Sequence, residues 1–114
     1  MPRIDSYSFG KITIDGKKYV KDVIILPDGV RPDWWRKNGH SLHPDDLKDV
    51  IEQIPEIFIM GCGAYGVLKV PDATREWIAQ RGIEFESYST KEACERYCEL
   101  SGRKRVAAGL HLTC

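Results

Sequence analysis

The sequence predicts a three-layer α/β domain with a mixed, partly parallel central sheet, flanking helices and an N-terminal β-hairpin region. Residues 57–60 read Ile-Phe-Ile-Met, and an apolar run without polar alternation is typical of a strand buried on both faces. From this run onward, strand-like and helix-like segments alternate, and such crossovers between parallel strands are nearly always right-handed. The 114 residues suffice for one core, so we expect residues 1–114 to form a single domain.

The N-terminal third predicts strands joined by tight turns. Asp15-Gly16 separates two short strand-like segments, and Asp-Gly favours a two-residue type I′ turn because both central residues need positive φ. A second continuous apolar run is expected to form a core strand. A short edge strand should follow it, since Pro32 limits further pairing. The expected strands are 11–14, 17–20, 23–26 and 30–31.

The first helix is expected over residues 44–54. Pro44 suits the first helical position. Apolar residues at positions 47, 50, 51 and 54 follow the spacing of a core-facing stripe, so all four are expected to face inward.

The rest of the chain alternates helix and strand. A second helix should stop at Gly82, because glycine favours the left-handed conformation found at helix ends. Ser89 begins the pattern Ser-Thr-Lys-Glu, which predicts a capping box at the start of a third helix. The expected elements are helix 71–81, strand 83–87, helix 90–101 and strand 106–112.

Charge and hydropathy exclude several classes of partner. The 17 lysine and arginine residues balance the 17 aspartate and glutamate residues, which gives no bulk attraction to nucleic acid or an anionic membrane. No apolar run approaches the ~20 residues that span a bilayer, and the N-terminus lacks a signal-peptide pattern. We therefore expect no nucleic-acid or membrane partner, and a cytoplasmic protein with its four cysteines reduced.

The glycines that follow residues 57–60 mark the expected position of any site. Gly61, Gly63 and Gly66 match G-x-G-x-x-G, a spacing that lets a backbone turn tightly and approach a phosphate. A dinucleotide site also needs a helix directly after the glycines, whereas residues 67–71 read as extended. A structural strand exit is therefore favoured over a cofactor site, and no cofactor is expected.

A ligand, if bound, should lie at the carboxyl edge of the sheet, where open α/β folds place their sites. The Cys62 thiol would have a lowered pKa if backbone N–H groups surrounded it. No histidine at local spacing supplies a base, so a packed loop cysteine is favoured over a catalytic one. The expected ligand-binding residues are Gly61, Cys62, Gly63, Ser89 and Thr90, with Arg36 as a counter-charge at the rim.

Two adjacent tryptophans, Trp34 and Trp35, lie in an irregular segment. One is expected to cover the core while the other lies exposed. An exposed aromatic residue beside Arg36 suits an interaction surface for a protein partner.

The remaining histidines and cysteines favour structural roles. His40 and His43 would need ligands from elsewhere to hold a metal, and Cys94 and Cys98 lack the C-x-x-C spacing of common redox and zinc sites. His111 lies inside an apolar strand pattern, so a hydrogen-bonded core histidine is expected. No metal site is predicted.

An ordered set of residues from the tryptophan segment onward matches a known family pattern. The matching residues are Trp35, Arg36, Gly39, His40, Pro44, residues 46–50, 59–63 and 68–71, Gly82, Ile83, Thr90, Ala93, Tyr97, and residues 105–106 and 111–114. In these residues the sequence resembles a small family of unknown function, which includes the human adipogenesis-associated domain-containing protein and, more distantly, a mitochondrial complex I assembly factor. Where the family often has Tyr-Asn, this chain has Tyr97-Cys98.

The resemblance implies a three-layer α/β fold with a mixed sheet and implies no reaction. Eukaryotic members are linked to assembly or regulatory roles. We therefore expect a non-enzymatic binding or assembly and regulatory module. The alternative is a protein or enzyme that binds an anionic or nucleotide-like ligand through the loop of residues 61–63. The ligand, the partner and the oligomeric state stay open.

Overall fold

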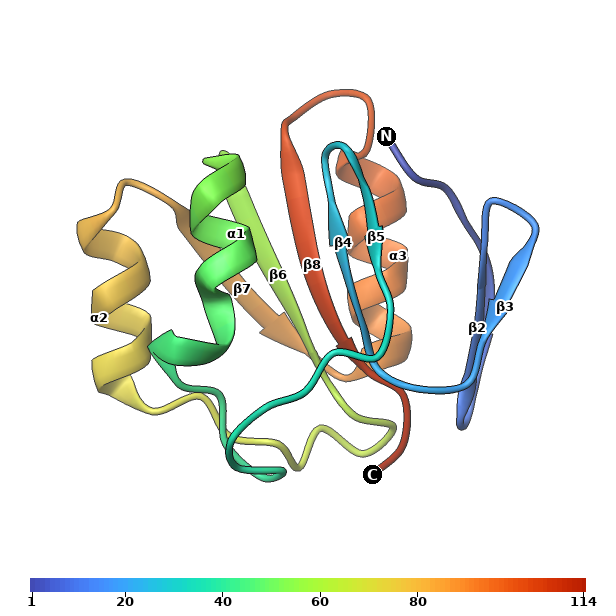
Figure 1. Cartoon of the computed structure of the whole chain (residues 1–114), viewed down its shortest axis with the longest axis horizontal. Helices are drawn as coiled ribbons and strands as arrows, with labels where there is room; N and C mark the ends of the chain where they lie inside the picture. The colour runs from blue at the N-terminus through green and yellow to red at the C-terminus, as the bar shows by residue number, and fades with distance from the viewer.

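The computed structural model of the chain describes residues 1–114 and confirms the mixed α/β fold (Figure 1). The central sheet has five strands in the order β5-β4-β8-β6-β7. Strand β6 is parallel to β7 and β8, while β4 is antiparallel to β5 and β8. The strands are β4 (Val23–Leu26), β5 (Gly29–Arg31), β6 (Ile57–Cys62), β7 (Glu84–Tyr88) and β8 (Val106–His111).

Helices cover both faces of this sheet (Figure 1). One face carries a 3-10 turn, η1 (Pro44–Leu47), and the helices α1 (Lys48–Gln53) and α2 (Asp72–Gln80). The other face carries α3 (Thr90–Leu100) together with a three-stranded antiparallel sheet. That sheet contains β1 (Ile4–Ser8), β2 (Lys11–Ile14) and β3 (Lys17–Tyr19).

The predicted hairpin is confirmed between β2 and β3. Asp15 and Gly16 both have positive φ, 50° and 79°, as a type I′ turn requires. The pairing of β1 with β2 adds a strand that the sequence pattern did not predict.

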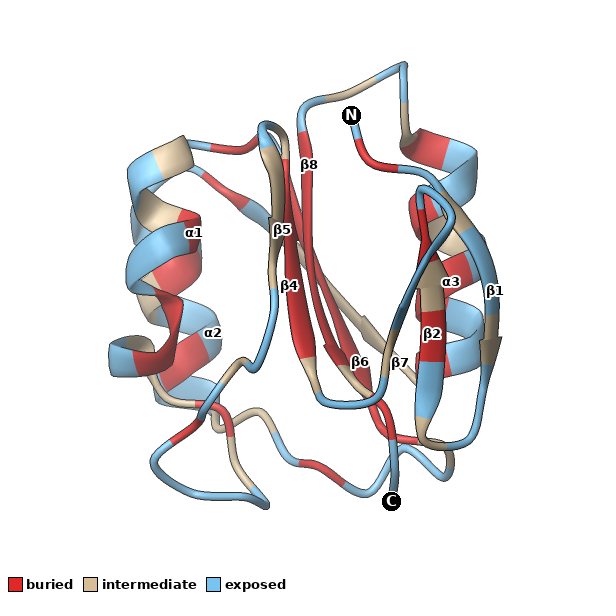
Figure 2. Ribbon diagram, turned by 45° about the vertical axis from the view of Figure 1, so that its right-hand side comes forward, coloured by how far each residue is buried: buried red, intermediate tan, exposed pale blue.

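Strand β6 is buried on both faces, as its apolar run predicted, and Figure 2 shows it buried along its length together with β8. Ile57 and Ile59 belong to the core shared with α3 and the small sheet. Phe58 and Met60 belong to the core on the α1 and α2 face. Because successive side chains of a strand point to opposite faces, one short segment joins both cores.

The first helix ends earlier than predicted. Helix α1 stops at Gln53, and Ile54 adopts the left-handed conformation with φ 46° and is 73% exposed. The expectation that position 54 faces the core is therefore wrong. Pro55 disfavours the helical conformation at the residue before it, and the Arg105 guanidinium binds the freed Gln53 carbonyl at 2.7 and 3.0 Å.

The start of α3 also differs in detail from the prediction. Ser89 is its N-cap residue, but the Ser89 hydroxyl donates to the Glu92 carboxylate at 2.8 Å and caps no backbone N–H. The predicted capping box is thus wrong, although the residue that starts the helix is right. No helix of the protein combines the length and apolar character needed to cross a membrane.

Candidate functional site

The glycine loop and the start of α3 meet at the carboxyl edge of the sheet. In the parallel β6–β7 pair, Gly61 lies opposite Tyr88, so both segments leave the sheet at the same end. The Gly63 N–H donates to Thr90 Oγ1 at 2.9 Å, and the Thr90 N–H donates to the Gly63 carbonyl at 3.0 Å. Thr90 Oγ1 also donates to the His111 carbonyl at 2.5 Å. The convergence was predicted, but the two segments are in direct contact.

Close packing explains the glycines of this loop. A Cβ on Gly61 would lie 3.1 Å from Thr90 Oγ1 and 3.2 Å from Thr90 Cα. Gly63 has φ +96°, and a Cβ there would lie 2.7 Å from the Thr113 carbonyl oxygen. Glycine is therefore required at position 63, and at position 61 a larger residue would crowd Thr90. Since the Gly63 N–H is already donated to Thr90, it is not free for an anion, and ligand binding by this loop stays a prediction.

Cys62 is a buried thiol at the end of β6. Burial raises its pKa, although the positive charges of Arg75 and Arg36 oppose that effect. Cys62 and His111 are register partners on β6 and β8, yet the only hydrogen bond of the Cys62 Sγ is to the Met60 carbonyl at 3.9 Å. A thiol with a raised pKa is a weak nucleophile at neutral pH, which favours the packed loop cysteine over the catalytic one.

Arg36 lies at the same edge, but in a buried ionic cluster with Asp22 and His111. Its Nη1 is 2.9 Å from Asp22 Oδ2, without the alignment of a hydrogen bond, and its Nε has no partner. His111 Nδ1 is 2.7 Å from Asp22 Oδ2 and 3.2 Å from Arg36 Nη2. The expected hydrogen-bonded histidine is thereby confirmed. Arg36 is only 8% exposed and faces this cluster. It does not line the cleft next to Cys62 that is described below.

Asp22 is the member of this cluster that sequence reasoning missed. Its Oδ1 accepts the Leu112 N–H at 2.8 Å. Burial alone would raise the pKa of Asp22, but the interaction with His111, the hydrogen bond from the Leu112 N–H and the contact with the Arg36 guanidinium outweigh it and lower the pKa. One sequence signal could have predicted this contact. Asp22 lies directly before one apolar strand and His111 lies at the end of another, and antiparallel pairing of the two strands brings these residues together.

The two tryptophans divide their roles as predicted. The Trp34 ring covers Gly109, where a Cβ would lie 2.8 Å from the ring, and its Nε1 donates to the Asp46 carbonyl at 3.2 Å. The Arg36 guanidinium carbon lies 4.9 Å from the Trp34 ring centroid. Trp35, by contrast, is 84% exposed. One side chain thus anchors the loop while its neighbour projects into solvent.

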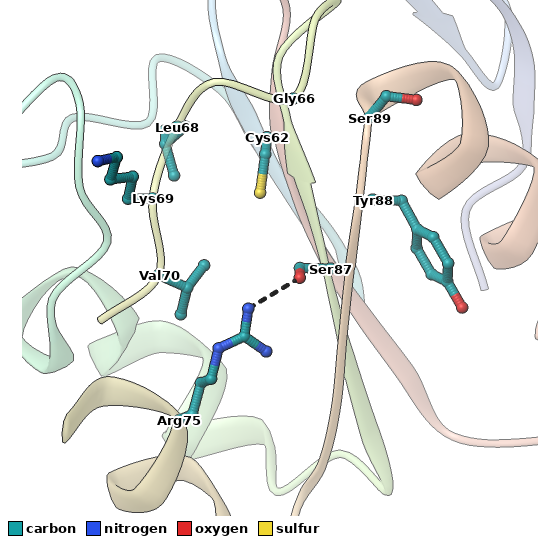
Figure 3. Close-up of a pocket in the computed structure, with 9 residues that line it drawn as sticks. All are labelled: Cys62, Gly66, Leu68, Lys69, Val70, Arg75, Ser87, Tyr88 and Ser89. Atoms are coloured by element: carbon teal, nitrogen blue, oxygen red, sulfur yellow. Dashed lines mark hydrogen bonds between the residues drawn. The ribbon is translucent and has the colours of Figure 1, made fainter. Parts of the chain in front are cut away.

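A cleft of about 460 Å³ opens beside Cys62, on the α2 side of the sheet (Figure 3). Of the predicted ligand-binding residues, it includes Cys62 and Ser89 only. Arg75, which sequence reasoning missed, reaches it from α2 and donates to Ser87 Oγ at 3.2 Å. The alternation of apolar and polar residues along β7 was the sequence signal for this side of the cleft, because it places Ser87 on the same face as Phe85, toward α2. The cleft is lined by Cys62, Gly66, Leu68, Lys69, Val70, Arg75, Ser87, Tyr88 and Ser89.

Residues 4–111 match the family described as "Protein of unknown function (DUF498/DUF598)". The chain belongs to this family. The DUF498/DUF598 match spans nearly all of the fold described above and agrees with the resemblance to a small family of unknown function. The family description names no activity.

Several solved structures of other proteins have a fold similar to that of this chain. The conserved hypothetical protein PH1505 from Pyrococcus horikoshii OT3 is 29% identical, with a TM-score of 0.87 over 98% of this chain and 99% of that one. A protein described as MT938 is 28% identical, with a TM-score of 0.81 over 100% of both chains. A Mth938-like domain from Bordetella pertussis is 16% identical, with a TM-score of 0.67 over 97% of this chain and 85% of that one. At that identity, the last likeness concerns the fold alone.

Proposed function

We propose that the protein is a non-enzymatic binding module that docks onto a partner protein through the loop that contains Trp34, Trp35 and Arg36. The observation that carries the proposal is the 84% exposure of Trp35 between two anchored neighbours. Trp34 is fixed against Gly109 and Asp46, and Arg36 is buried with Asp22. Exposed tryptophans on ordered segments contribute strongly to interfaces, because little conformational freedom is lost on binding.

Charge around Trp35 indicates the chemistry of the partner. Trp35 lines a surface pocket whose other residues include four aspartates and two cationic residues, Arg31 and Lys48. Asp33 and Asp49 form no ion pair within the chain. A lysine or arginine of the partner could stack on the Trp35 ring and face these two carboxylates. The proposed partner therefore presents a basic segment.

Two further observations support a binding role. The raised pKa of the Cys62 thiol argues against its use as a nucleophile. The resemblance to proteins with assembly and regulatory roles supports a partner that is a protein.

We include a cytoplasmic location in the proposal because all four thiols are unpaired, as is usual in reducing compartments. A fluorescent fusion found outside the cytoplasm would contradict this location.

The alternative of an anion or nucleotide site on the glycine loop has weaker support. The Gly63 N–H is donated to Thr90 and the Ala64 N–H to the Thr113 carbonyl. A loop whose donors are engaged offers few hydrogen bonds to a phosphate.

The test compares binding by the wild type, Trp35→Ser and Ile54→Ser. Ile54 is also exposed, but it precedes the opposite end of β6. Affinity capture followed by cross-linking should identify a partner segment that contains lysine or arginine. A synthetic peptide of that segment should bind the wild type and Ile54→Ser alike and should lose most affinity for Trp35→Ser. Binding should also weaken as salt increases. A partner that binds Trp35→Ser with unchanged affinity, or turnover of a defined metabolite without any partner, would contradict the proposal.

A further inference from the structure

Arg75 is an oriented cation without an ionic partner. Its guanidinium carbon lies 5.2 Å from the Phe85 ring centroid, and its Nη2 donates to Ser87 Oγ at 3.2 Å. Both contacts come from β7 and hold the Arg75 side chain over the α2 side of that strand. Arg36 and Arg96 have carboxylate partners, whereas Arg75 forms no ion pair. Its positive charge is therefore available to a ligand.

The cleft that Arg75 enters combines this charge with apolar walls. Leu68 and Val70 form one side, and the Cys62 thiol points toward the space next to the Arg75–Ser87 pair (Figure 3). No carboxylate lines the cleft. In the same view, the Lys69 side chain extends away from Arg75 (Figure 3). The cleft thus offers one directed cation and an apolar surface beside it.

We propose that this cleft binds a small monocarboxylic acid, with its carboxylate on Arg75 and its apolar body against Leu68 and Val70. A guanidinium binds a carboxylate through two parallel N–H···O bonds. A phosphate ester carries more charge and is usually held by several backbone N–H groups, but the Gly63 and Ala64 N–H groups nearby are engaged. The volume of about 460 Å³ falls within the usual range for small-molecule sites.

Hexanoate is a suitable probe, because it joins a carboxylate to a short apolar chain. Titration of the ¹⁵N-labelled protein should give saturable shifts of the backbone amides of Leu68, Val70 and Ser87. Hexanamide, which has the same apolar chain without the charge, should bind about tenfold more weakly or not at all, since a charge-assisted hydrogen bond is lost. Inorganic phosphate at matched ionic strength should bind more weakly than hexanoate.

Two arginines of the α2 region provide a matched pair of variants. Arg75→Gln should weaken hexanoate binding about tenfold or more. Arg81→Gln should leave it unchanged, because Arg81 stacks on Trp77 at 3.6 Å and lies outside the cleft. Ser87→Ala keeps the charge but removes one orienting contact, so its effect should be smaller. Thermal unfolding of each variant verifies that it is folded.

Three results would overturn the proposal. The first is an absence of saturable shifts up to about 10 mM hexanoate, a concentration that would detect even a very weak complex. The second is equal hexanoate affinity of Arg75→Gln and the wild type. The third is tighter binding of phosphate than of hexanoate. Trp35→Ser should bind hexanoate like the wild type, so failure here and failure of the protein-binding proposal are distinguishable.

Discussion

Asp22 balances the buried charge of Arg36, and its removal should be costly. Asp22→Asn keeps the shape of the side chain but leaves the guanidinium buried without a counter-charge. Loss of one partner of a buried pair costs about 3 kcal/mol or more, so the free energy of unfolding measured in urea should fall by about that amount. Asp28→Asn is the control, because its ion pair with Arg31 is exposed and long at 3.5 Å and such pairs contribute at most about 1 kcal/mol.

The cost of Asp22→Asn should also depend on pH. The pKa of Asp22 is lowered in the folded protein, so its stabilising effect is complete above the unfolded value of about 4 and is lost as pH falls through the folded pKa. The difference in unfolding free energy between wild type and Asp22→Asn should therefore be constant at neutral pH and shrink in acid. A difference that stays constant down to the acid limit of folding would show that Asp22 does not stabilise as a carboxylate.

Single residues were predictable where local sequence decides their environment. One of the adjacent tryptophans was expected to cover the core and the other to be exposed, and Trp34 and Trp35 divide in this way. The partnership of Asp22 with His111 spans 89 residues, and no local pattern contains it. For Arg75, the alternation along β7 indicated the face of Ser87, but the contact between α2 and β7 is tertiary and no local pattern contains it.

Thr90 joins three elements at the carboxyl edge of the sheet, since its hydroxyl serves both the Gly63 N–H and the His111 carbonyl. Thr90→Val preserves the shape but leaves both backbone groups without this partner. Each unsatisfied buried group costs about 1–3 kcal/mol, so unfolding in urea should show a loss of at least about 2 kcal/mol. Thr13→Val in β2 replaces a threonine without side-chain hydrogen bonds and should change stability little. Equal effects of the two variants would contradict the assigned role.

The end of α1 offers a stabilising substitution. Ile54 is held at φ 46°, and the left-handed conformation costs about 1–2 kcal/mol for a residue with a side chain. Ile54→Gly removes that cost but gains freedom in the unfolded chain, so a net stabilisation of about 0.5–1 kcal/mol is expected. Ile54→Ala removes the exposed side chain while keeping most of the backbone cost, and it should have little effect on the melting temperature. A destabilised glycine variant would show that the isoleucine side chain contributes a contact of its own.

Elements with a strong pattern were predicted in the right part of the chain, but the residues at which they begin or end differ from the prediction. The apolar run at β6 gave a buried strand at the expected residues. In the first helix, positions 47 and 50 are buried as the periodicity indicated. At position 54, the backbone preference imposed by Pro55 prevailed over that periodicity. The edge sequence of β1, Ile-Asp-Ser-Tyr-Ser, is too polar to indicate a strand without its partner β2.

The two cores share β6 and β8, so the whole molecule should unfold as one unit. Ile14 packs with α3 in one core, while Trp34 and Trp77 pack against the other. Ile14→Ala should cost about 3 kcal/mol and should shift the tryptophan fluorescence transition in urea as far as the circular dichroism transition. Lys18→Ala, at an exposed position of β3, is the control and should shift neither. A fluorescence transition unchanged by Ile14→Ala would mean that the small sheet unfolds separately.

The order of strands in the central sheet could not be read from the sequence. The crossovers from β6 through α2 and α3 predicted parallel neighbours, and β7 and β8 do flank β6. Antiparallel pairing of β8 with β4 joins segments that are distant in the chain. That pairing brings Asp22 to His111, and the parallel pairing of β8 with β6 places the glycine loop at the same edge. The site therefore depended on the part of the topology that local patterns do not contain.

The central position of β8 affects how the chain can fold during synthesis. Strands β4 and β6 do not pair with each other and are joined only through β8, which is the last strand in sequence. Before β8 has emerged from the ribosome, the β4–β5 hairpin and the β6–β7 region are separate parts of the nascent chain. Their apolar faces are then uncovered. The nascent polypeptide must stay shielded from aggregation until β8 leaves the exit tunnel, and only then can both cores close.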